Sequence, residues 1–476
     1  MSISDAYDSH DALGLAALVA KGDVTPAELL DEAIARVERL NPKINAVVHR
    51  CDDLARQAIA SGLPGGPFRG VPFLLKDLYT EMAGTELCNG SALWTGYHSD
   101  HDTNLVARYK AAGLVIFGRT TSPEFGLTAT TESRVHGDTR NPWDLSRSAG
   151  GSSGGASAAV AAGILPMANA SDGGGSIRIP ASACGLFGIK PTRGRTPMGP
   201  DTGEGWAGMS TVHAVSRSVR DSAALLDATA GPDLGAPYYA EPPRRPCLDE
   251  AGADPGRLRI ALQRTAFNGA EVDPACIAAV EDAAKLCQSL GHEVEEAPVI
   301  ADFERLGEAS FTIIKANIFA SARTRAAALG RDLQPDDLEP IAWATADQGS
   351  AVLAVDYVEA VKTVHAVGRQ VAAFMERYDV ILSPTMATPP MELGRISLRR
   401  EDPAGYARDI GRAVGFTSLF NASGNPAMSV PLYWDDATGL PIGVQFAGRY
   451  GDEATLFRLA GQLEQARPWA NRRPSI

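Results

Sequence analysis

Cysteine is scarce in this sequence, and no two cysteines are near each other. The chain has 476 residues and six cysteines, Cys51, Cys88, Cys184, Cys247, Cys276 and Cys287. No CxxC pair is present to supply two ligands of a structural zinc ion. We therefore expect free thiols, as in a reducing compartment, and no metal site.

The sequence also lacks a long apolar run. Its longest stretch of small apolar residues, 156–168, is too short to span a bilayer and contains Ser157 and Pro166. The first residues show neither the basic start nor the apolar stretch of a signal peptide. We expect a cytoplasmic protein that does not bind membranes.

Basic residues are in deficit. Lysine and arginine together number 44 against 57 acidic residues, which gives a formal net charge of −13. This balance argues against nucleic acid or an anionic membrane as a partner. With 45% hydrophobic residues the chain can bury a large core. The sequence does not distinguish a monomer from a homodimer.

Local patterns predict alternating strands and helices. Thr25 and Glu28 form a capping box around Pro26, which predicts a helix over residues 25–40 that ends at Asn41-Pro42. Further helices are expected at 103–112 and 273–290, and buried strands at 70–77, 114–118, 258–262 and 378–384. The alternation favours an α/β fold with a parallel or mixed sheet. Residues 230–256 are rich in proline, glycine and charge, and suggest a surface excursion.

Two glycine-rich serine tracts stand out, at residues 149–155 (AGGSSGG) and 171–180 (SDGGGSIRIP). Glycine lets the backbone approach a ligand closely, and successive free N–H groups form an anion-binding nest. A hydroxyl in such a nest suits acyl transfer. Gly/Ser tracts are often flexible linkers. Here the intervening residues 156–168 are apolar, which argues for a packed location.

Three kinds of site fit glycine-flanked serines. A phosphate-binding loop requires a lysine or a GxGxxG pattern that neither tract has. An α/β-hydrolase elbow would use Ser153 within GxSxG, but the preceding residues 141–148 are polar and form a poor strand. The third possibility joins the serines to Lys76, which follows a buried strand. Burial can lower a lysine pKa far enough to make it a base, although a lone lysine is usually an ordinary surface residue.

Several segments together resemble the amidase signature family. The main matches are residues 70–77 (GVPFLLKD), 150–155 (GGSSGG) and 172–180 (DGGGSIRIP), with support from 184–192, 216–221 and 439–446. The resemblance extends over roughly residues 20–465. Within the family the chain is most similar to bacterial amidases acting on linear or cyclic amides, including nylon-oligomer hydrolases.

This resemblance implies one α/β domain over residues 1–476, with a central mixed β-sheet covered by helices on both faces. Its parts are a mainly helical segment (1–64), a catalytic core (65–230), a more variable substrate-side region (231–375) and a C-terminal part that returns to the core (376–476).

The resemblance also implies the chemistry. Ser176 is the nucleophile that forms an acyl-enzyme, Ser152 is a bridging serine on a cis peptide, and Lys76 is the base. The oxyanion would be held by the backbone N–H groups of Gly173, Gly174, Gly175 and Ser176. The expected substrate is a small-molecule amide, with esters or carbamates as side substrates, and no cofactor is expected.

Two other functions compete with this one. A glutaminase subunit of a tRNA-dependent amidotransferase resembles the same family, but the acidic charge and Ile179, where that subgroup has glutamine, argue against it. A catalytically inactive binding protein is disfavoured because all three candidate catalytic residues are present.

Other residues around the tracts have expected roles. Many family members have threonine where this chain has Gly173, so we expect a wider pocket or a looser loop. Asp172 is expected to anchor the loop through backbone N–H groups and Arg178 to pair with it. Ser153 is either a loop-supporting serine or a solvated turn serine. Cys184 is expected in the core.

The acyl pocket is expected to include Phe125, Gly126, Gly151 and Trp206. Further pocket candidates are Phe311, Ile314 and Trp343. Residues 98–102 (HSDHD) could suggest a metal site, but they precede a helix for which Asp102 or Thr103 is a natural cap, so a solvated loop is expected.

Overall fold

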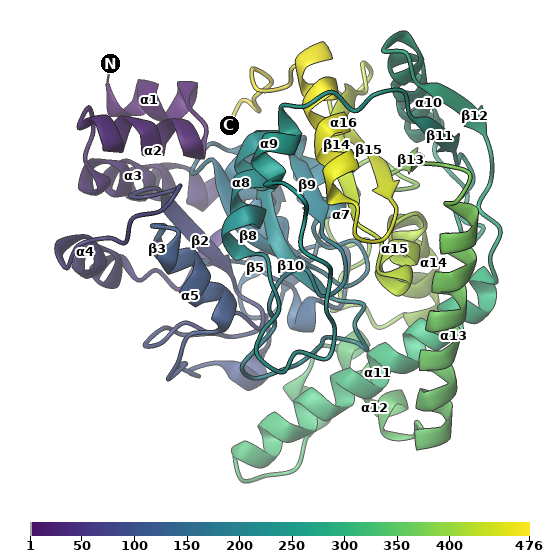
Figure 1. Ribbon diagram of the computed structural model, residues 1–476. Coiled ribbons are helices and arrows are strands. Elements are labelled where there is room, and N and C mark those ends of the chain that lie inside the picture. Colours follow the sequence, from purple (N-terminus) through teal and green to yellow (C-terminus); the bar gives the residue numbers. More distant parts are fainter. Residues whose placement is uncertain (1) are drawn as a thin grey trace.

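The computed structural model describes residues 2–476 (Figure 1). Its α-helices are α1 (Ile3–Ser9), α2 (Ala12–Lys21), α3 (Pro26–Ile44), α4 (Asp52–Ala60), α5 (Asn104–Ala111), α6 (Gly154–Ala161), α7 (Arg178–Cys184), α8 (Val219–Thr229), α9 (Cys247–Ala251), α10 (Pro274–Ser289), α11 (Phe303–Ala328), α12 (Pro340–Ser350), α13 (Ala354–Phe374), α14 (Pro403–Val414), α15 (Ser418–Ser423) and α16 (Glu453–Ala466). Its strands are β1 (Val47–Val48), β2 (Pro72–Lys76), β3 (Val115–Thr120), β4 (Glu132–Ser133), β5 (Gly137–Asp138), β6 (Arg140–Asn141), β7 (Asp144–Ser148), β8 (Met167–Asp172), β9 (Phe187–Lys190), β10 (Thr211–Ser216), β11 (Arg259–Leu262), β12 (Glu293–Glu296), β13 (Val380–Pro384), β14 (Ala427–Trp434) and β15 (Pro441–Gly448).

A mixed sheet forms the centre of the molecule. Its eight strands follow the order β12-β11-β13-β15-β14-β9-β10-β8. β11 is parallel to both β12 and β13, and the remaining neighbours are antiparallel. The expected α/β fold with a mixed central sheet is confirmed.

Helices pack on both faces of this sheet because successive side chains of a buried strand point in opposite directions. In β13, Val380 and Leu382 join the apolar cluster that contains α8, α10 and α16. Ile381, between them, joins the cluster that contains α13 and α15 on the other face. Helices α11, α12 and α13 pack together beyond this second face, at the lower right of Figure 1.

A second, three-stranded sheet has the order β1-β3-β2 and brings the strand before Lys76 against the edge of the large sheet. β2 packs beside β8, where the Lys76 backbone N–H donates to Asn169 Oδ1 at 3.0 Å. The first glycine-serine tract leads into α6, and every residue of α6 is buried. The second tract joins β8 to α7. Both tracts therefore meet the end of β2 in packed surroundings, and the linker interpretation is wrong.

Two local predictions need correction. The capping box of α3 forms as expected, but the helix continues through Pro42 to Ile44. Asn45 then ends it in a left-handed conformation, and its N–H donates to the Asn41 carbonyl. A proline removes only one donor, so the last turn can tolerate it.

The second correction concerns residues 141–148, which were expected to be a poor strand. Asp144–Ser148 does form β7, paired with β6 in a small hairpin outside the central sheet. The segment before the first tract is thus a strand, but it does not form the sheet-to-helix elbow that an α/β-hydrolase needs.

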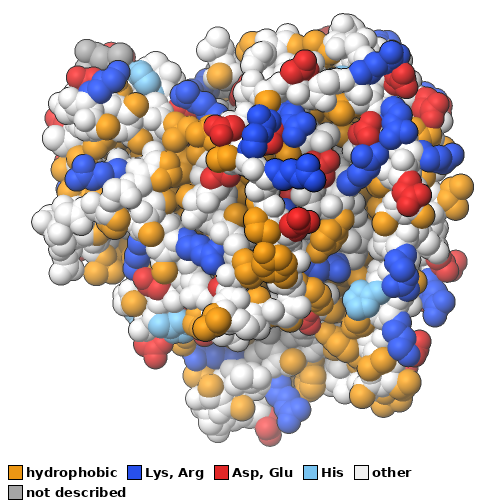
Figure 2. Space-filling view, in the orientation of Figure 1, with side chains coloured by type: hydrophobic (Ala, Val, Ile, Leu, Met, Phe, Trp, Pro, Cys, Tyr) orange, Lys and Arg blue, Asp and Glu red, His pale blue; other side chains and the backbone are white. Residues whose placement is uncertain are grey.

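The surface of the described residues is mixed in charge. On the face in Figure 2, acidic and basic side chains lie beside one another rather than in one basic patch. Among residues 2–476, no helix combines the length and apolar character needed to cross a bilayer.

Candidate active site

A pocket of about 150 Å³ opens where the two glycine-serine tracts meet. Ser152, Ser171 and Ser176 line one part of it. Phe125 and Trp206 contribute aromatic surface. Glu204 is its one carboxylate within the described residues. The pocket thus combines several hydroxyls with a mostly apolar wall.

Lys76 lies beneath the pocket and is completely buried. Its Nζ donates to Ser152 Oγ at 2.7 Å and to Ser171 Oγ at 3.0 Å. Burial lowers the pKa of Lys76 to about 7, against the opposing charge of Asp172. A substantial fraction of this amine is neutral near pH 7, and the neutral amine can accept a proton from a hydroxyl.

The two serines of interest share the pocket wall. The peptide bond between Gly151 and Ser152 is cis. The Ser153 N–H donates to the Ser176 carbonyl at 3.3 Å, which connects the two tracts directly. Among the hydrogen bonds of residues 2–476, none joins the Ser152 and Ser176 hydroxyls. The structure therefore brings Lys76 onto Ser152 and places Ser176 beside them.

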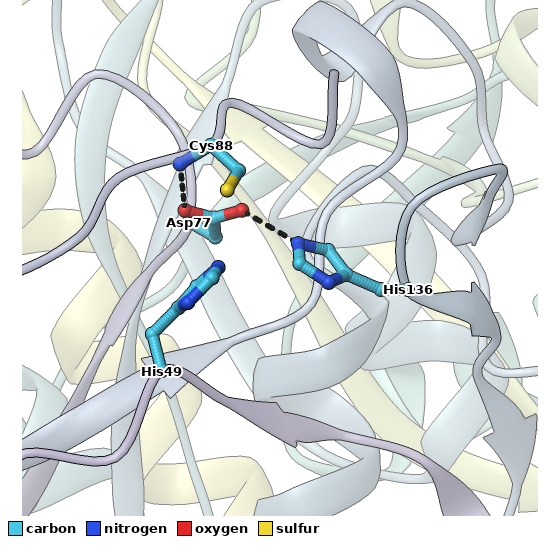
Figure 3. A group of neighbouring side chains, drawn as sticks. All are labelled: His49, Asp77, Cys88 and His136. Atoms are coloured by element: carbon cyan, nitrogen blue, oxygen red, sulfur yellow. Dashed lines mark hydrogen bonds and ion pairs between the residues drawn. The ribbon is translucent and has the colours of Figure 1, made fainter. Parts of the chain in front are cut away.

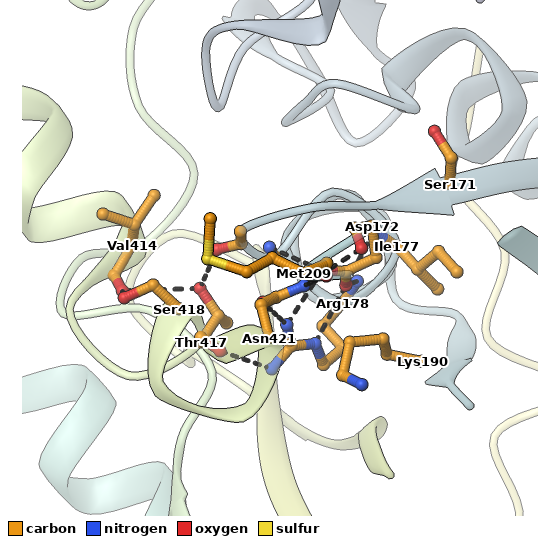
Figure 4. A network of polar contacts seen from close by, with 12 residues as sticks. Ser171, Asp172, Ile177, Arg178, Lys190, Met209, Val414, Thr417, Ser418 and Asn421 are labelled. Carbon is orange, nitrogen blue, oxygen red and sulfur yellow. Dashed lines mark hydrogen bonds and ion pairs between the residues drawn. The ribbon is translucent and has the colours of Figure 1, made fainter. Parts of the chain in front are cut away.

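Asp172 organises the second tract. Its carboxylate accepts the N–H of Gly175 at 2.7 Å and that of Ile177 at 3.1 Å. Arg178 donates to the same carboxylate through Nε and Nη2, each at 2.9 Å, and both side chains are fully buried. The predicted anchor and the predicted ion pair are confirmed (Figure 4).

The same network ties the loop to α15. Asn421 donates to Asp172 Oδ1 at 2.8 Å, and Thr417 Oγ1 donates to the Gly174 carbonyl at 2.6 Å. Burial acts to raise the pKa of Asp172, but Arg178 and Asn421 hold it well below its usual range. The loop that presents Ser176 is thus fixed from both sides of the fold.

The expected set of oxyanion donors needs one correction. The N–H of Gly175 is engaged by Asp172, so it does not face an incoming carbonyl. Its φ of +135° is a conformation that favours glycine, and a Cβ there would lie 2.4 Å from Thr417 Oγ1. Gly175 therefore shapes the loop, which leaves Gly173, Gly174 and Ser176 as candidate donors.

The absence of a side chain at Gly173 does not widen the pocket, contrary to expectation. A Cβ at this position would lie 2.9 Å from two ring carbons of Trp206. The indole fills the space that a threonine would occupy. Nor is the loop loose, given its hydrogen bonds to Asp172 and Thr417.

The predicted pocket residues divide into two groups. Phe125, Gly126 and Trp206 line the pocket, and a Cβ at Gly126 would lie 3.0 Å from Ser152 Oγ. Gly151 does not line it, because it packs against the backbone of Thr130. The more distant candidates, Phe311, Ile314 and Trp343, also lie outside the pocket.

The sequence reasoning missed other pocket residues. Asn317 and Ser321 come from α11, one and two turns beyond the Ile314 that was proposed. Ser171 precedes Asp172 in the quoted tract, and its contact with Lys76 was not foreseen. Helical periodicity marks the apolar face of α11, whereas these polar residues give no such signal.

The remaining predictions near the site hold. Ser153 is buried and donates to the Ser171 carbonyl at 3.2 Å, so the solvated alternative is wrong. Cys184 is a buried thiol. Thr103 caps α5, and His101 pairs with Asp100 and Asp201 on the surface, as expected of a solvated loop.

Comparisons with known proteins agree with this site. Residues 28–457 match the family described as Amidase. The chain is 38% identical to a 6-aminohexanoate-cyclic-dimer hydrolase of Paenarthrobacter ureafaciens, over 98% of this chain and 97% of that protein. A solved structure of 6-aminohexanoate cyclic dimer hydrolase superimposes with a TM-score of 0.92 at 38% identity, covering 98% of each chain. A glutamyl-tRNA(Gln) amidotransferase structure from Thermotoga maritima gives 0.76 at 26% identity, covering 97% of this chain and 96% of that one.

The contact between Gly173 and Trp206 generates a prediction. Gly173→Ala should lower kcat/KM about 10-fold, because the new methyl group displaces the indole from the pocket wall. In the double variant with Trp206→Leu, the added loss from Gly173→Ala should largely disappear. Steady-state kinetics of the four proteins measure this coupling. Independent, multiplicative losses would contradict the packing argument.

Proposed function

The chain belongs to the amidase family and is an amide hydrolase, and we propose that Ser176, Ser152 and Lys76 carry out its reaction. One observation supports this most strongly. A buried lysine whose pKa is about 7 donates to Ser152, which shares a pocket wall with Ser176. Among the described residues, no other arrangement around the pocket combines a base with two hydroxyls.

The proposed reaction has two halves. Neutral Lys76 accepts the proton of Ser152 as Ser152 accepts that of Ser176, and Ser176 Oγ bonds to the amide carbon. The proton then returns through Ser152 to the leaving nitrogen, and the C–N bond breaks. Water repeats the sequence on the acyl-enzyme, which releases the acid and regenerates the free serine.

The negative oxygen that forms in each half needs donors. The backbone N–H groups of Gly173, Gly174 and Ser176 belong to the loop that Asp172 and Thr417 fix in place. One such donor typically contributes about 3 kcal/mol to the transition state. A rigid loop supplies these donors without a rearrangement during the reaction.

The substrate we propose is a small amide with an apolar body, cyclic amides included. The pocket is mostly apolar, with Phe125 and Trp206 beside the serines. The chain is also similar over its whole length to hydrolases named for the cyclic dimer of 6-aminohexanoate. The glutaminase alternative has less support, because the amidotransferase structure is less similar in both sequence and fold.

Variants of the three serines test the mechanism. Ser176→Ala should lower kcat by about 10⁴-fold or more, since the nucleophile is lost. Ser152→Ala should be nearly as severe, and Ser153→Ala much milder. Kinetics and labelling by a fluorophosphonate, followed by mass spectrometry, measure these effects. Full activity in Ser176→Ala would refute the mechanism, and a stronger effect at Ser153 than at Ser152 would favour a GxSxG nucleophile.

The pKa of Lys76 sets an expected pH dependence. Protonated Lys76 cannot act as a base, so kcat/KM should rise with pH through an apparent pKa of about 7 and then level. The rise follows the neutral fraction of the amine, which is small below this pKa. Circular dichroism at each pH separates this effect from unfolding. A rate that stays constant from about pH 5.5 to 8.5 would contradict the role of Lys76.

A substrate panel tests the proposed substrate class. The purified protein should release the linear product from the cyclic dimer of 6-aminohexanoate, or from another small cyclic amide, faster than ammonia from glutamine. Product analysis by chromatography measures both. Preferential glutamine hydrolysis, together with co-purifying subunits, would support the amidotransferase alternative instead.

A further inference from the structure

A second group of reactive side chains lies behind the proposed active site. His49, Asp77, Cys88 and His136 come from well-separated positions, and each offers one ligand atom within 4.8 Å of all the others (Figure 3). Asp77, Cys88 and His136 are at least nine-tenths buried, and His49 is exposed over 14% of its side chain. None of the four lines the active-site pocket.

We propose that these four side chains bind a structural zinc ion. Two imidazoles, one thiolate and one carboxylate are all common zinc ligands, and the mixture of nitrogen and sulfur disfavours magnesium or calcium. The charges balance as well. The Asp77 carboxylate and the Cys88 thiolate together neutralise Zn²⁺, which a buried site requires.

An unpaired nitrogen points to the ligand. His49 Nε2 is buried and has no hydrogen-bond partner within the described residues. On the other side of the ring, Nδ1 faces Glu86 Oε2 at 3.1 Å. A carboxylate behind a histidine fixes the proton on the far nitrogen and directs the free lone pair at a metal. His49 is thus held in the tautomer that a zinc ligand needs.

The spacing suits a four-coordinate ion after a small contraction. Asp77 Oδ2 and His136 Nε2 are 3.1 Å apart. Ligand atoms around tetrahedral zinc are separated by about 3.3–3.8 Å. The widest pair must therefore approach by about 1 Å, a shift that side-chain rotation can supply. Binding releases the thiol proton of Cys88 and the proton between His136 and Asp77 to solvent.

The site would be closed, because the protein supplies all four ligands and leaves no position for substrate. Its role would be to stabilise the pocket wall. Asp77 follows Lys76 directly, and its carboxylate also accepts the N–H of Cys88 at 2.8 Å and of Gly90 at 3.3 Å. The ion would fasten this loop, which carries the pocket residues Leu78 and Tyr79, to His49 and His136.

The expectation of no metal site came from cysteine spacing alone. Here only one ligand is a cysteine, and the others lie 11 to 48 residues from it in sequence. A hydrogen-bonded cluster without an ion is the competing interpretation. It accounts for the contact between Asp77 and His136 but leaves His49 Nε2 unpaired.

Metal content decides between them. The full-length protein is prepared in zinc-supplemented medium, dialysed against metal-free buffer and analysed by mass spectrometry of the elements. We expect about one zinc per chain, and X-ray absorption at the zinc edge should show one sulfur neighbour at about 2.3 Å. Zinc bound without sulfur would identify a different site and overturn the proposal, as would a content below about 0.1 per chain that excess Zn²⁺ does not raise.

Variants locate the ion. Cys88→Ala and His49→Gln should each lose most of the bound zinc and the rise in melting temperature that added Zn²⁺ gives the parent protein. Cys51→Ala is the matched control, since Cys51 is a partly buried thiol outside the cluster, and it should keep both. Unchanged zinc content in both cluster variants would overturn the proposal. If a variant does not fold, the sulfur signal of the parent protein remains decisive.

Discussion

The proposed chemistry depends on excluding water from the Lys76 amine. A fall in its pKa from 10.5 to about 7 corresponds to about 5 kcal/mol of lost preference for the charged form. Burial at the end of β2 supplies this effect, without help from a neighbouring cation. The packing of β2 beside β8 and the hydrogen bond from Lys76 to Asn169 hold the strand end there. The sheet edge is therefore part of the catalytic design and not only a support for it.

The ion pair of Asp172 and Arg178 protects that arrangement. Asp172 is the one charged group that acts to raise the pKa of Lys76. Arg178 takes up this charge through two hydrogen bonds, and Asn421 takes another. A buried pair of this kind contributes little net stability, whereas breaking it is costly. We infer that its value lies in placing the Ser176 loop while it limits the effect of a carboxylate on the neighbouring base.

Local patterns predicted the elements, and motif order predicted the candidate catalytic residues. The capping box of α3, the buried strand before Lys76 and the anchor at Asp172 are encoded within a few residues, so sequence alone reveals them. Asn317, Ser321 and Glu204 reach the pocket through long-range packing, which no local pattern reports. Gly175 and Gly151 were misassigned for the same reason. Whether a glycine N–H faces a substrate or a carboxylate depends on side chains folded against it.

The exchange between Gly173 and Trp206 shows how such packing can determine substrate preference. A residue without a side chain beside the nucleophile leaves room, and here the indole of Trp206 fills it. Trp206 adopts a φ of +53°, which a tryptophan rarely adopts. That conformation has an energetic cost, so the surrounding contacts must hold the ring in place. The wall beside Ser176 is consequently flat and apolar where a threonine would present a hydroxyl, and this favours amides with an apolar body over polar ones such as glutamine.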